Sequence, residues 1–597
     1  MLIHRLSATA ALCILAGLAQ AQTSADSVAP EYGTEAGSLV LSEAAAAALA
    51  LRDAGTPVQA ENWMVVAANP LAVEAGSAVL AAGGTAADAM VTVQAVLGLV
   101  EPQSSGLGGG AFLVWYDAES GALTTLDGRE TAPLTADPTL FQIDGERMGF
   151  WDAVVGGRSV GTPGTPMLMQ AAHDRWGNTD WAELLAPAIE LAEAGFVVSP
   201  RLAGAVARDQ ERLSTYPRTA AYFLPDGEPI AAGSVLRNYP YAATLKAIAE
   251  QGAQVFYEGD IAQGIVDTVQ NAEGNPGRLT LLDFSAYRVV ERPAVCAQYR
   301  ELDVCGMGPP SSGALTVGQI LGQLDSFDLA AMGPTDPQSW RLIGDASRQA
   351  FADRGRYMAD SDYVPVPTQG LVDPDYLAAR AEALSGETAL ESVAPGEPTW
   401  SIALRWADNV SIELSSTSHI SIVDQYGNAL SMTTTIENGF GSRLMAPGGF
   451  LLNNELTDFS FRSHSNGVPI ANRVEPGKRP RSSMSPTIVM QDGKPMLVIG
   501  SPGGSRIIGY VAQSIIAQVD WGMDVQQAIT MPHAVNRFGT YDLEAGTEME
   551  AMEAALTALG YEVNIRDLNS GLHAIRISED GLAGGADPRR EGIAIGN

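Results

Sequence analysis

A run of hydroxyl-bearing residues at 415–421 lies where a long polar loop meets a β-rich segment. A threonine hydroxyl is a weak nucleophile, but a threonine at a new chain end carries its own base, the α-amino group. That amine has an ordinary pKa of about 7.7–8.0, so part of it is unprotonated near neutrality. Cleavage between Ser416 and Thr417 would therefore make Thr417 both nucleophile and base. If the chain stays uncut, the run is an ordinary strand edge.

Two later segments offer groups that an acyl transfer needs. Gly503 and Gly504 stand at the predicted start of a helix, where free N–H groups and the positive end of the helix dipole suit an oxyanion. Ser482 and Ser483 follow three cationic residues within 478–481, a combination that suits a carboxylate. A helix cap and a solvated basic loop are the structural alternatives.

Carboxylates that could hold an ammonium group come from Glu437, Glu455 and Asp458. Taken singly, each could be an ordinary surface acid. Their occurrence together with the hydroxyl run, the glycine pair and the basic serine segment favours a functional site.

Two other motifs are weaker. Residues 157–161 match the G-x-S-x-G nucleophile elbow, which makes Ser159 the alternative nucleophile of a serine hydrolase. The elbow needs a strand before it and a helix after it, whereas glycines and a proline surround this one. The glycine-rich segment 106–111 matches a dinucleotide fingerprint, but a helix precedes it and a strand follows, so the order is reversed. We expect only a loop that allows close backbone approach.

The cysteines and histidines indicate no metal site. Cleavage of the leader removes Cys13, and Cys296 and Cys305 then lie in two short strands around a polar turn, which an oxidising compartment would join as a disulfide. Two buried free thiols are the alternative. The six histidines show no metal-binding spacing. We expect neither a metal nor an organic cofactor.

Composition limits the partners of the chain. Its formal net charge is −34 and it has only three lysines, which argues against nucleic acid and anionic membranes. Residues 1–21 read as a cleaved signal peptide, with a short basic start, a brief apolar run and an A-x-A site. We expect an exported protein, periplasmic or secreted, without a membrane span.

The elements that must position these groups follow from periodicity and caps. Residues 22–60 are expected to be a mobile lead-in, and 385–416 a long loop with a strand or two at most. Predicted helices cover 71–82, 86–100 and 505–519, and predicted strands cover 111–117, 418–423, 429–436, 486–490 and 496–500. Two β-rich blocks flanked by helices indicate a layered α/β domain.

Taken together, the chain resembles the γ-glutamyltranspeptidase (glutathione hydrolase) family of the N-terminal-nucleophile hydrolase superfamily, from about residue 64 to 588. The resemblance rests on these segments: 68–72 (ANPLA), 106–112 (GLGGGAF), 127–133 (DGRETAP), 309–313 (PPSSG), 417–419 (TSH), 452–459 (LNNELTDF), 478–486 (KRPRSSMSP) and 500–505 (GSPGGS).

The resemblance implies an αββα sandwich made as a precursor that cuts itself into a large subunit, 22–416, and a small subunit, 417–597, which form one folded heterodimer. It implies that Thr417 acts in both autoprocessing and catalysis, and that the Thr435 hydroxyl orients it. The roles implied for the other positions are an oxyanion pair (Gly503, Gly504), a grip on the substrate α-carboxylate (Arg129, Ser482, Ser483) and a pocket for its α-amino group (Glu437, Glu455, Asp458).

The implied reaction is a two-step transfer of the γ-glutamyl group of glutathione or related amides to water, an amino acid or a dipeptide. Three features depart from relatives. Ser418 replaces a second threonine, and residues 437 and 455 are both glutamate where some relatives have amides. The segment 459–481 is shorter than in relatives with a long lid, and it contains no tyrosine. We therefore expect the acceptor side of the site to be open and hydrolysis to compete strongly with transfer. The alternatives are a glutaryl-cephalosporin-acylase-like amidase and a non-catalytic exported binding protein.

Overall fold

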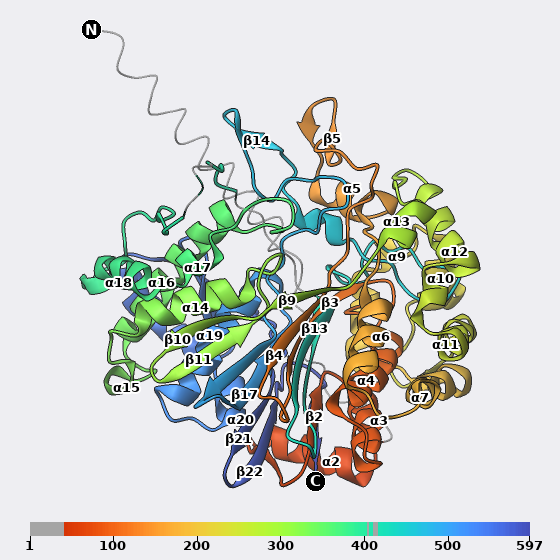
Figure 1. The fold of residues 1–597 in the computed structure, drawn as a ribbon, viewed down its shortest axis with the longest axis horizontal. Coiled ribbons are helices and arrows are strands. Elements are labelled where there is room, and N and C mark those ends of the chain that lie inside the picture. The colour runs from red at the N-terminus through yellow and green to blue at the C-terminus, as the bar shows by residue number, and fades with distance from the viewer. Residues whose placement is uncertain (1–40, 401, 403–404, 410–415) are drawn as a thin grey trace.

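Two antiparallel seven-stranded sheets form the centre of the molecule (Figure 1). The computed structural model describes residues 41–400, 402, 405–409 and 416–597. The predicted signal peptide, 1–21, lies outside the described residues. The sheet that contains Thr417, here the Thr417 sheet, has the order β23 (Ile593–Gly596), β2 (Met64–Ala67), β12 (Thr417–Val423), β13 (Ala429–Thr435), β3 (Gly110–Tyr116), β4 (Leu123–Gly128) and β9 (Val290–Pro293). The partner sheet has the order β1 (Val58–Ala60), β22 (Gly581–Ala586), β21 (His573–Ser578), β17 (Lys494–Gly500), β16 (Thr487–Gln491), β11 (Leu302–Gly306) and β10 (Val295–Tyr299).

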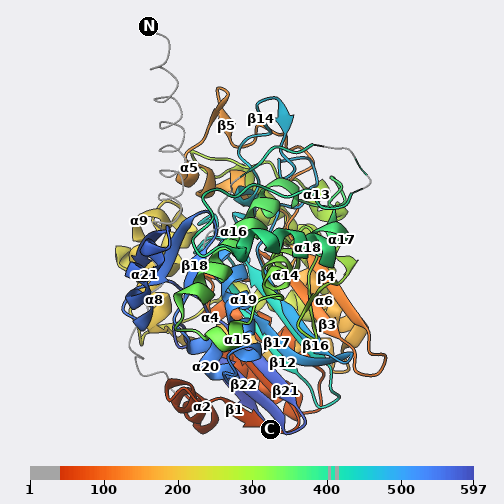
Figure 2. The same ribbon diagram turned by 90° about the vertical axis from the view of Figure 1, so that its left-hand side faces the viewer.

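The two sheets face each other and each carries helices on its outer face, because alternate residues of a strand point to opposite faces. In β2, Val65 packs with one helical layer while Val66 packs between the sheets. In β17, Ile499 packs with the other helical layer and Val498 between the sheets. The predicted αββα sandwich is therefore confirmed, and Figure 2 shows one helical layer in front of the partner sheet.

The helices outside the Thr417 sheet are α3 (Pro70–Ala81), α4 (Ala86–Val100), α6 (Thr165–Trp176), α7 (Trp181–Ala194), α8 (Pro200–Arg208), α11 (Tyr239–Gln251) and α12 (Gly259–Gln270). Those outside the partner sheet are α14 (Gly313–Leu324), α16 (Pro337–Tyr357), α19 (Ile507–Val519) and α20 (Val525–Thr530). The remaining elements are α2 (Glu43–Asp53), α5 (Phe150–Val154), α9 (Gln210–Leu213), α10 (Pro217–Phe223), α13 (Leu281–Ala286), α15 (Leu329–Met332), α17 (Thr368–Leu371), α18 (Pro374–Ala381), α21 (Glu553–Ala558), β5 (Gln142–Ile143), β6 (Glu146–Arg147), β7 (Phe196–Val197), β8 (Val235–Leu236), β14 (His464–Ser465), β15 (Val468–Pro469), β18 (Ala534–Asn536), β19 (Thr540–Glu544) and β20 (Glu562–Arg566).

Helix α4 shows how sequence determines this packing. The helix begins with a capping box, in which the side chains of Thr85 and Asp88 each accept a backbone N–H from the other. Every residue of α4 is buried, as expected for a helix that is apolar almost all round. The glycine-rich turn that follows also forms as expected, since a side chain at Gly108 or Gly109 would lie 2.0 Å from a backbone oxygen of the 435–451 region.

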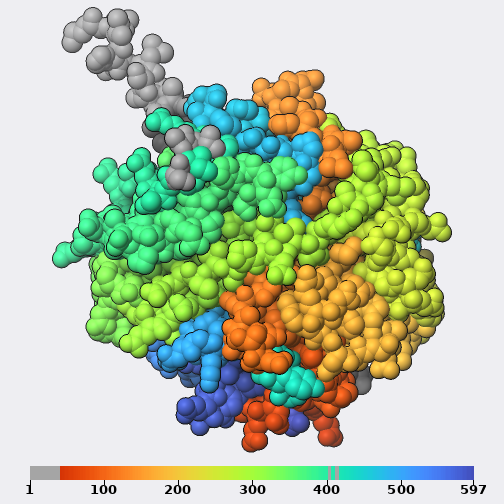
Figure 3. All heavy atoms as spheres, viewed as in Figure 1, coloured from red at the N-terminus to blue at the C-terminus, as the bar shows by residue number. Residues whose placement is uncertain are grey.

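The expectation of a mobile lead-in over 22–60 is wrong for its described part. Ser42 caps α2, whose Ala45 and Ala48 are buried, and β1 joins the partner sheet. Small alanines allow this helix to pack closely, which composition alone did not reveal. The beginning and the end of the described chain lie side by side at the lower end of the molecule (Figures 1 and 3). In the described part of 385–416 there is no strand.

The longest helices of the described chain are either interrupted by charge or too short to cross a bilayer, so none qualifies as a membrane span.

Cys296 and Cys305 lie directly opposite each other in the β10–β11 pair, with Cα atoms 4.0 Å apart, and form a disulfide. Changing exposed Cys296 to serine and buried Cys305 to alanine should lower the apparent free energy of unfolding by about 2–3 kcal/mol, because the closed loop is short. Activity should persist, since β10 is the edge of the partner sheet. Denaturant titration with and without reductant tests this, and equal midpoints for the oxidised and reduced wild type would contradict it.

Candidate active site

The ends of four neighbouring strands meet at one end of the Thr417 sheet. Thr417, the first residue of β12, pairs with Thr435, the last residue of β13. Thr435 in turn pairs with Gly110, the first residue of β3, and Ala111 pairs with Gly128, the last residue of β4. Segments that leave β13 and β4 therefore emerge beside Thr417. Because neighbouring strands run in opposite directions, residues from three distant parts of the sequence lie together at this end of the sheet.

Thr435 connects the Thr417 hydroxyl to the peptide bond before it. Thr435 Oγ1 donates to the carbonyl oxygen of Ser416 at 2.8 Å and accepts from the amide of Glu437 at 2.9 Å. It also lies 3.1 Å from Thr417 Oγ1. Because the single hydroxyl proton of Thr435 is donated to the Ser416 carbonyl, the Thr417 hydroxyl is the donor in the hydrogen bond between the two threonines. The arrangement polarises the Ser416 carbonyl and aligns the Thr417 hydroxyl beside it.

The turn after β17 presents the two expected glycine amides. Gly503 and Gly504 have φ values of 138° and 57°, conformations that glycine adopts without strain. Across the described chain, neither N–H donates a hydrogen bond, so both are available to an anion. The side chain of Arg590 connects this turn to Thr417: it donates to the Thr417 carbonyl, and a Cβ on Gly571 would contact both Arg590 and Pro502 at 2.6 Å.

Arg129 lies immediately after β4 and is buried among carboxylates. One terminal nitrogen donates to Glu455, and the other donates to Asp458 at 2.5 Å. Further donations reach the carbonyls of Pro480 at 3.2 Å and Arg481 at 2.9 Å. The guanidinium therefore joins the acidic segment after β13 to the basic serine segment.

Glu130 is a buried member of this cluster that sequence reasoning did not assign. Burial raises the pKa of Glu130 to about 8 and the pKa of Glu455 well above its usual value, with Arg129 opposing the shift in both. Each of these two carboxyls also affects the pKa of the other, so Glu130 and Glu455 belong to one buried cluster. The only sequence feature that could have assigned Glu130 to this cluster is its position directly after Arg129.

Glu437 is oriented by a second residue that sequence reasoning missed. Asn454 donates from Nδ2 to Glu437 Oε2 and accepts from the amide of Asn438 at 2.9 Å. Glu437 itself has a φ of 75°, which turns the chain sharply after β13. Its carboxylate is buried, as is that of Glu455, and its charge adds to the rise in the pKa of Glu455.

Ser482 and Ser483 lie beside the Arg129 cluster. Ser482 Oγ accepts from the amide of Met484 at 3.1 Å, and its carbonyl accepts from Ser312 Oγ at 2.7 Å. Ser483 Oγ accepts from a terminal nitrogen of buried Arg354 at 2.7 Å. Arg354, from α16, is therefore a second cation next to the residues expected to bind the substrate carboxylate. No pattern in the sequence around Arg354 predicted this position.

Ser159 lies outside this cluster. It ends a short 3-10 helix, Gly157–Ser159, is fully buried and donates to the carbonyl of Val154 at 2.8 Å. A nucleophile elbow places an exposed hydroxyl between a strand and a helix. This geometry does not fit a serine hydrolase.

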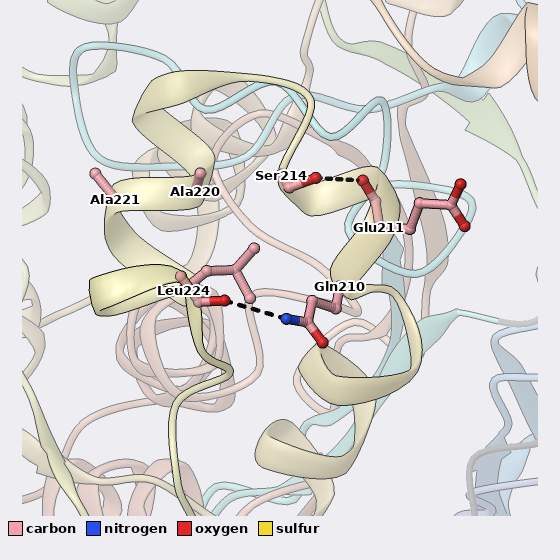
Figure 4. A pocket seen from close by; sticks show the side chains of 7 residues that line it. Gln210, Glu211, Ser214, Ala220, Ala221 and Leu224 are labelled. Carbon is pink, nitrogen blue, oxygen red and sulfur yellow. Dashed lines mark hydrogen bonds between the residues drawn. The ribbon is translucent and has the colours of Figure 1, made fainter.

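A surface hollow lies between α9, α10 and the turn that follows (Figure 4). Gln210 donates to the carbonyl of Gly227 at 3.1 Å and Ser214 to that of Glu211 at 2.7 Å. Glu211 is the only ionisable side chain among the described residues that line this hollow, and the Ser214 hydroxyl is bonded to a backbone carbonyl instead of a side-chain base. The hollow therefore lacks a nucleophile paired with a base. Within the described residues, no group of three or more histidine, cysteine, aspartate or glutamate side chains is arranged to hold a metal ion.

Comparison with known proteins matches residues 72–597 to the family described as Gamma-glutamyltranspeptidase. The chain is 36% identical to a glutathione hydrolase proenzyme of Bacillus subtilis (strain 168), with 90% of this chain and 92% of that protein covered. It is 35% identical to a glutathione hydrolase proenzyme of Escherichia coli (strain K12), with 89% and 91% covered. A solved cephalosporin acylase from Bacillus halodurans is similar with a TM-score of 0.80 and 26% identity, covering 91% of this chain and 97% of the other.

Proposed function

This chain belongs to the γ-glutamyltranspeptidase family, and on that premise we propose that it is an exported precursor that cuts itself before Thr417 and then cleaves γ-glutamyl amides such as glutathione. The products are a large subunit, 22–416, and a small subunit, 417–597, held together as one sandwich. The γ-glutamyl group passes to water, an amino acid or a dipeptide. The observation that carries the proposal is the Thr435 hydroxyl shared between Thr417 and the Ser416 carbonyl.

Self-cleavage starts with attack of Thr417 Oγ1 on the carbonyl carbon of Ser416. The Thr435 hydroxyl donates to the oxygen on which negative charge develops. Collapse breaks the peptide C–N bond, the proton released from the Thr417 hydroxyl passes to the leaving nitrogen, and Ser416 remains as an ester on Thr417. Water then hydrolyses this ester, which releases the Ser416 carboxylate and frees both the Thr417 hydroxyl and its α-amine.

Catalysis repeats the attack on a different carbonyl. The Thr417 α-amine takes the hydroxyl proton while Oγ1 attacks the γ-amide carbonyl of the donor. The amides of Gly503 and Gly504 stabilise the oxyanion. The amine product leaves with a proton from the α-ammonium, and a γ-glutamyl ester remains on Thr417. Water or an acceptor amine then attacks this ester and restores the free enzyme.

The charge arrangement supports a donor that carries both a carboxylate and an ammonium group. When the donor binds, the Arg129 nitrogens that donate to Glu455 and Asp458 in this structure would turn to the substrate carboxylate, with Ser482 and Ser483 beside them. Glu455 and Asp458 pair with the same guanidinium, and the charge of Glu437 adds to the rise in the pKa of Glu455. An ammonium group that binds there favours ionised Glu455, because opposite charge lowers a raised carboxyl pKa.

The acceptor side is bounded by two short hairpins, β5–β6 and β14–β15, which project together at the top of Figure 1. Phe141 and Phe461 stack at 4.5 Å between them, and Gln142 donates to the carbonyl of Phe461 at 3.0 Å. Residues 459–481 contain no tyrosine. We therefore expect hydrolysis to compete strongly with transfer.

Comparison of γ-glutamyl-p-nitroanilide with glutaryl-p-nitroanilide tests the substrate class. The two differ only by the α-amino group, so the γ-glutamyl compound should have the higher kcat/KM by about 100-fold, the value of a lost buried ion pair. A preference for the glutaryl compound would indicate the acylase alternative. N-terminal sequencing of the small subunit in the same preparation should begin at Thr417.

A further inference from the structure

The side chain of Arg590 contacts the nucleophile residue from the connection between β22 and β23. Its Nη1 donates to the carbonyl oxygen of Thr417 at 2.9 Å, and its Nε donates to the carbonyl of Ser570 at 2.7 Å. The side chain is almost completely buried. A buried cation is therefore fixed on the residue whose hydroxyl and amine carry the proposed chemistry.

The loop at 569–571 is shaped to receive this guanidinium. A Cβ on Gly571 would lie 2.6 Å from Arg590 Cδ, so no larger residue could occupy that position without displacing the cation. Ser570 is held by His533 at 2.7 Å and by Asp587. The His533 ring centroid in turn lies 4.3 Å from that of Tyr510, whose ring packs so close to Gly503 that a Cβ there would lie 2.7 Å from it. The position of Arg590 is therefore fixed from several directions.

The backbone of Arg590 is anchored independently by the N-terminal helix α2. Arg52 Nη1 donates to the carbonyl of Arg590 at 3.0 Å and to that of Gly592 at 2.8 Å. The Arg590 amide also donates to the Asp587 carbonyl at 3.2 Å. Residues from both proposed subunits thus hold Arg590 against Thr417.

Three acidic side chains near Thr417 have hydrogen-bond partners of their own. Glu101 accepts from Ser418 at 3.4 Å but is paired with Arg201 at 2.8 Å. Glu591 accepts the Arg201 amide, and burial raises its pKa. Glu437 lies on the Thr435 side, with Asn454 on its carboxylate.

The two histidines in this region do not titrate near neutrality. Burial lowers the pKa of His573 to about 3, with Arg590 and Arg52 adding to the shift. Burial also lowers the pKa of His419 well below its usual value, with His573 adding to it. Among these charged side chains, the one that hydrogen-bonds to the backbone of Thr417 is Arg590.

We propose that Arg590 is a positioning residue that keeps the Thr417 α-amine in its basic form, because a fixed cation on the carbonyl of the same residue disfavours a second positive charge on its nitrogen. This inference rests on the proposed function, since it requires the amine that self-cleavage creates. The hydrogen bond from Arg590 to the Thr417 carbonyl also fixes the orientation of Thr417.

The test compares Arg590→Gln and Arg590→Lys with wild type and with Arg576→Gln. Arg576 is a half-buried arginine on β21 for which the described structure gives no ion pair, so its loss makes the same change in net charge away from Thr417. Purified proteins are reacted with cyanate across pH 5–9, and carbamylation of the small-subunit N-terminus is followed by mass spectrometry. The rate reports the unprotonated α-amine directly.

Arg590→Gln should raise the apparent pKa of the Thr417 amine by about one unit and move the acidic limb of kcat/KM by the same amount. At pH values on the acidic limb, kcat/KM then falls about tenfold, while its value on the high-pH plateau changes less. Arg590→Lys and Arg576→Gln should keep the wild-type amine pKa. The cyanate measurement separates this effect from that of Glu130, because burial raises the pKa of Glu130 to about 8 and its protonation could also affect activity in this range.

An unchanged amine pKa in Arg590→Gln would overturn the inference while leaving the proposed function intact. If Arg590→Gln does not self-cleave, the outcome depends on the lysine variant. Cleavage of Arg590→Lys at the wild-type rate supports a role for the charge, whereas failure of both variants shows that only the shape of arginine matters and overturns the inference. A wild-type chain that never exposes Thr417 contradicts the proposed function itself.

Discussion

Replacing Thr417 with alanine should give a protein that remains one chain and has lost at least about 10⁴-fold in activity. Alanine lacks the oxygen that must attack the Ser416 carbonyl, so the bond stays intact and no α-amine is formed. Removing a nucleophile typically costs this much or more. Intact mass reports the missing cleavage, and release of p-nitroaniline from γ-glutamyl-p-nitroanilide reports the missing activity.

Three matched variants separate this result from misfolding. Ser418→Ala removes the neighbouring hydroxyl, which contacts Glu101 only at 3.4 Å, and should cut itself and stay active. Ser159→Ala should also be active, because Ser159 is a buried hydroxyl bonded to a backbone carbonyl. Thr417→Ser retains the nucleophile and should be cut. An active Thr417→Ala chain, or inactive Ser159→Ala, would contradict the proposed mechanism.

The local parts of this site could be predicted from the sequence because they depend on neighbouring residues. Strand alternation and the turn at 425–428 define the hairpin that pairs Thr417 with Thr435. Two adjacent glycines after an apolar strand predict a turn with free amides at a helix start. The substrate grip was assigned by resemblance, and its roles remain predictions.

The parts that sequence reasoning missed are held by long-range contacts. Arg590 contacts Thr417 across 173 positions, and Arg354 contacts Ser483 across 129. Such pairs depend on how the two sheets and their helices pack, which no local pattern encodes. Helix α2 was missed for a different reason, since its alanines gave no amphipathic signal although two of them are buried.

Changing Arg129 to lysine should lower kcat/KM for γ-glutamyl-p-nitroanilide by about 10²–10³-fold, mainly through KM. Lysine keeps the charge that the buried acids require but loses the planar pair of donors that matches a carboxylate. Glutamine is a poorer choice, because uncompensated Glu455 and Asp458 would cost about 3–5 kcal/mol of stability. Steady-state kinetics on processed protein measures the effect.

Asp458→Asn provides the matched comparison, because it removes a negative charge from the ammonium side of the same cluster. Both substrates carry the carboxylate, so Arg129→Lys should weaken the γ-glutamyl and glutaryl compounds alike. Only the γ-glutamyl compound carries an ammonium group, so Asp458→Asn should reduce its kcat/KM about tenfold or more relative to the glutaryl compound. If Arg129→Lys leaves KM unchanged, or if Asp458→Asn affects both substrates equally, the two ends of the donor do not bind where the charges of this cluster place them.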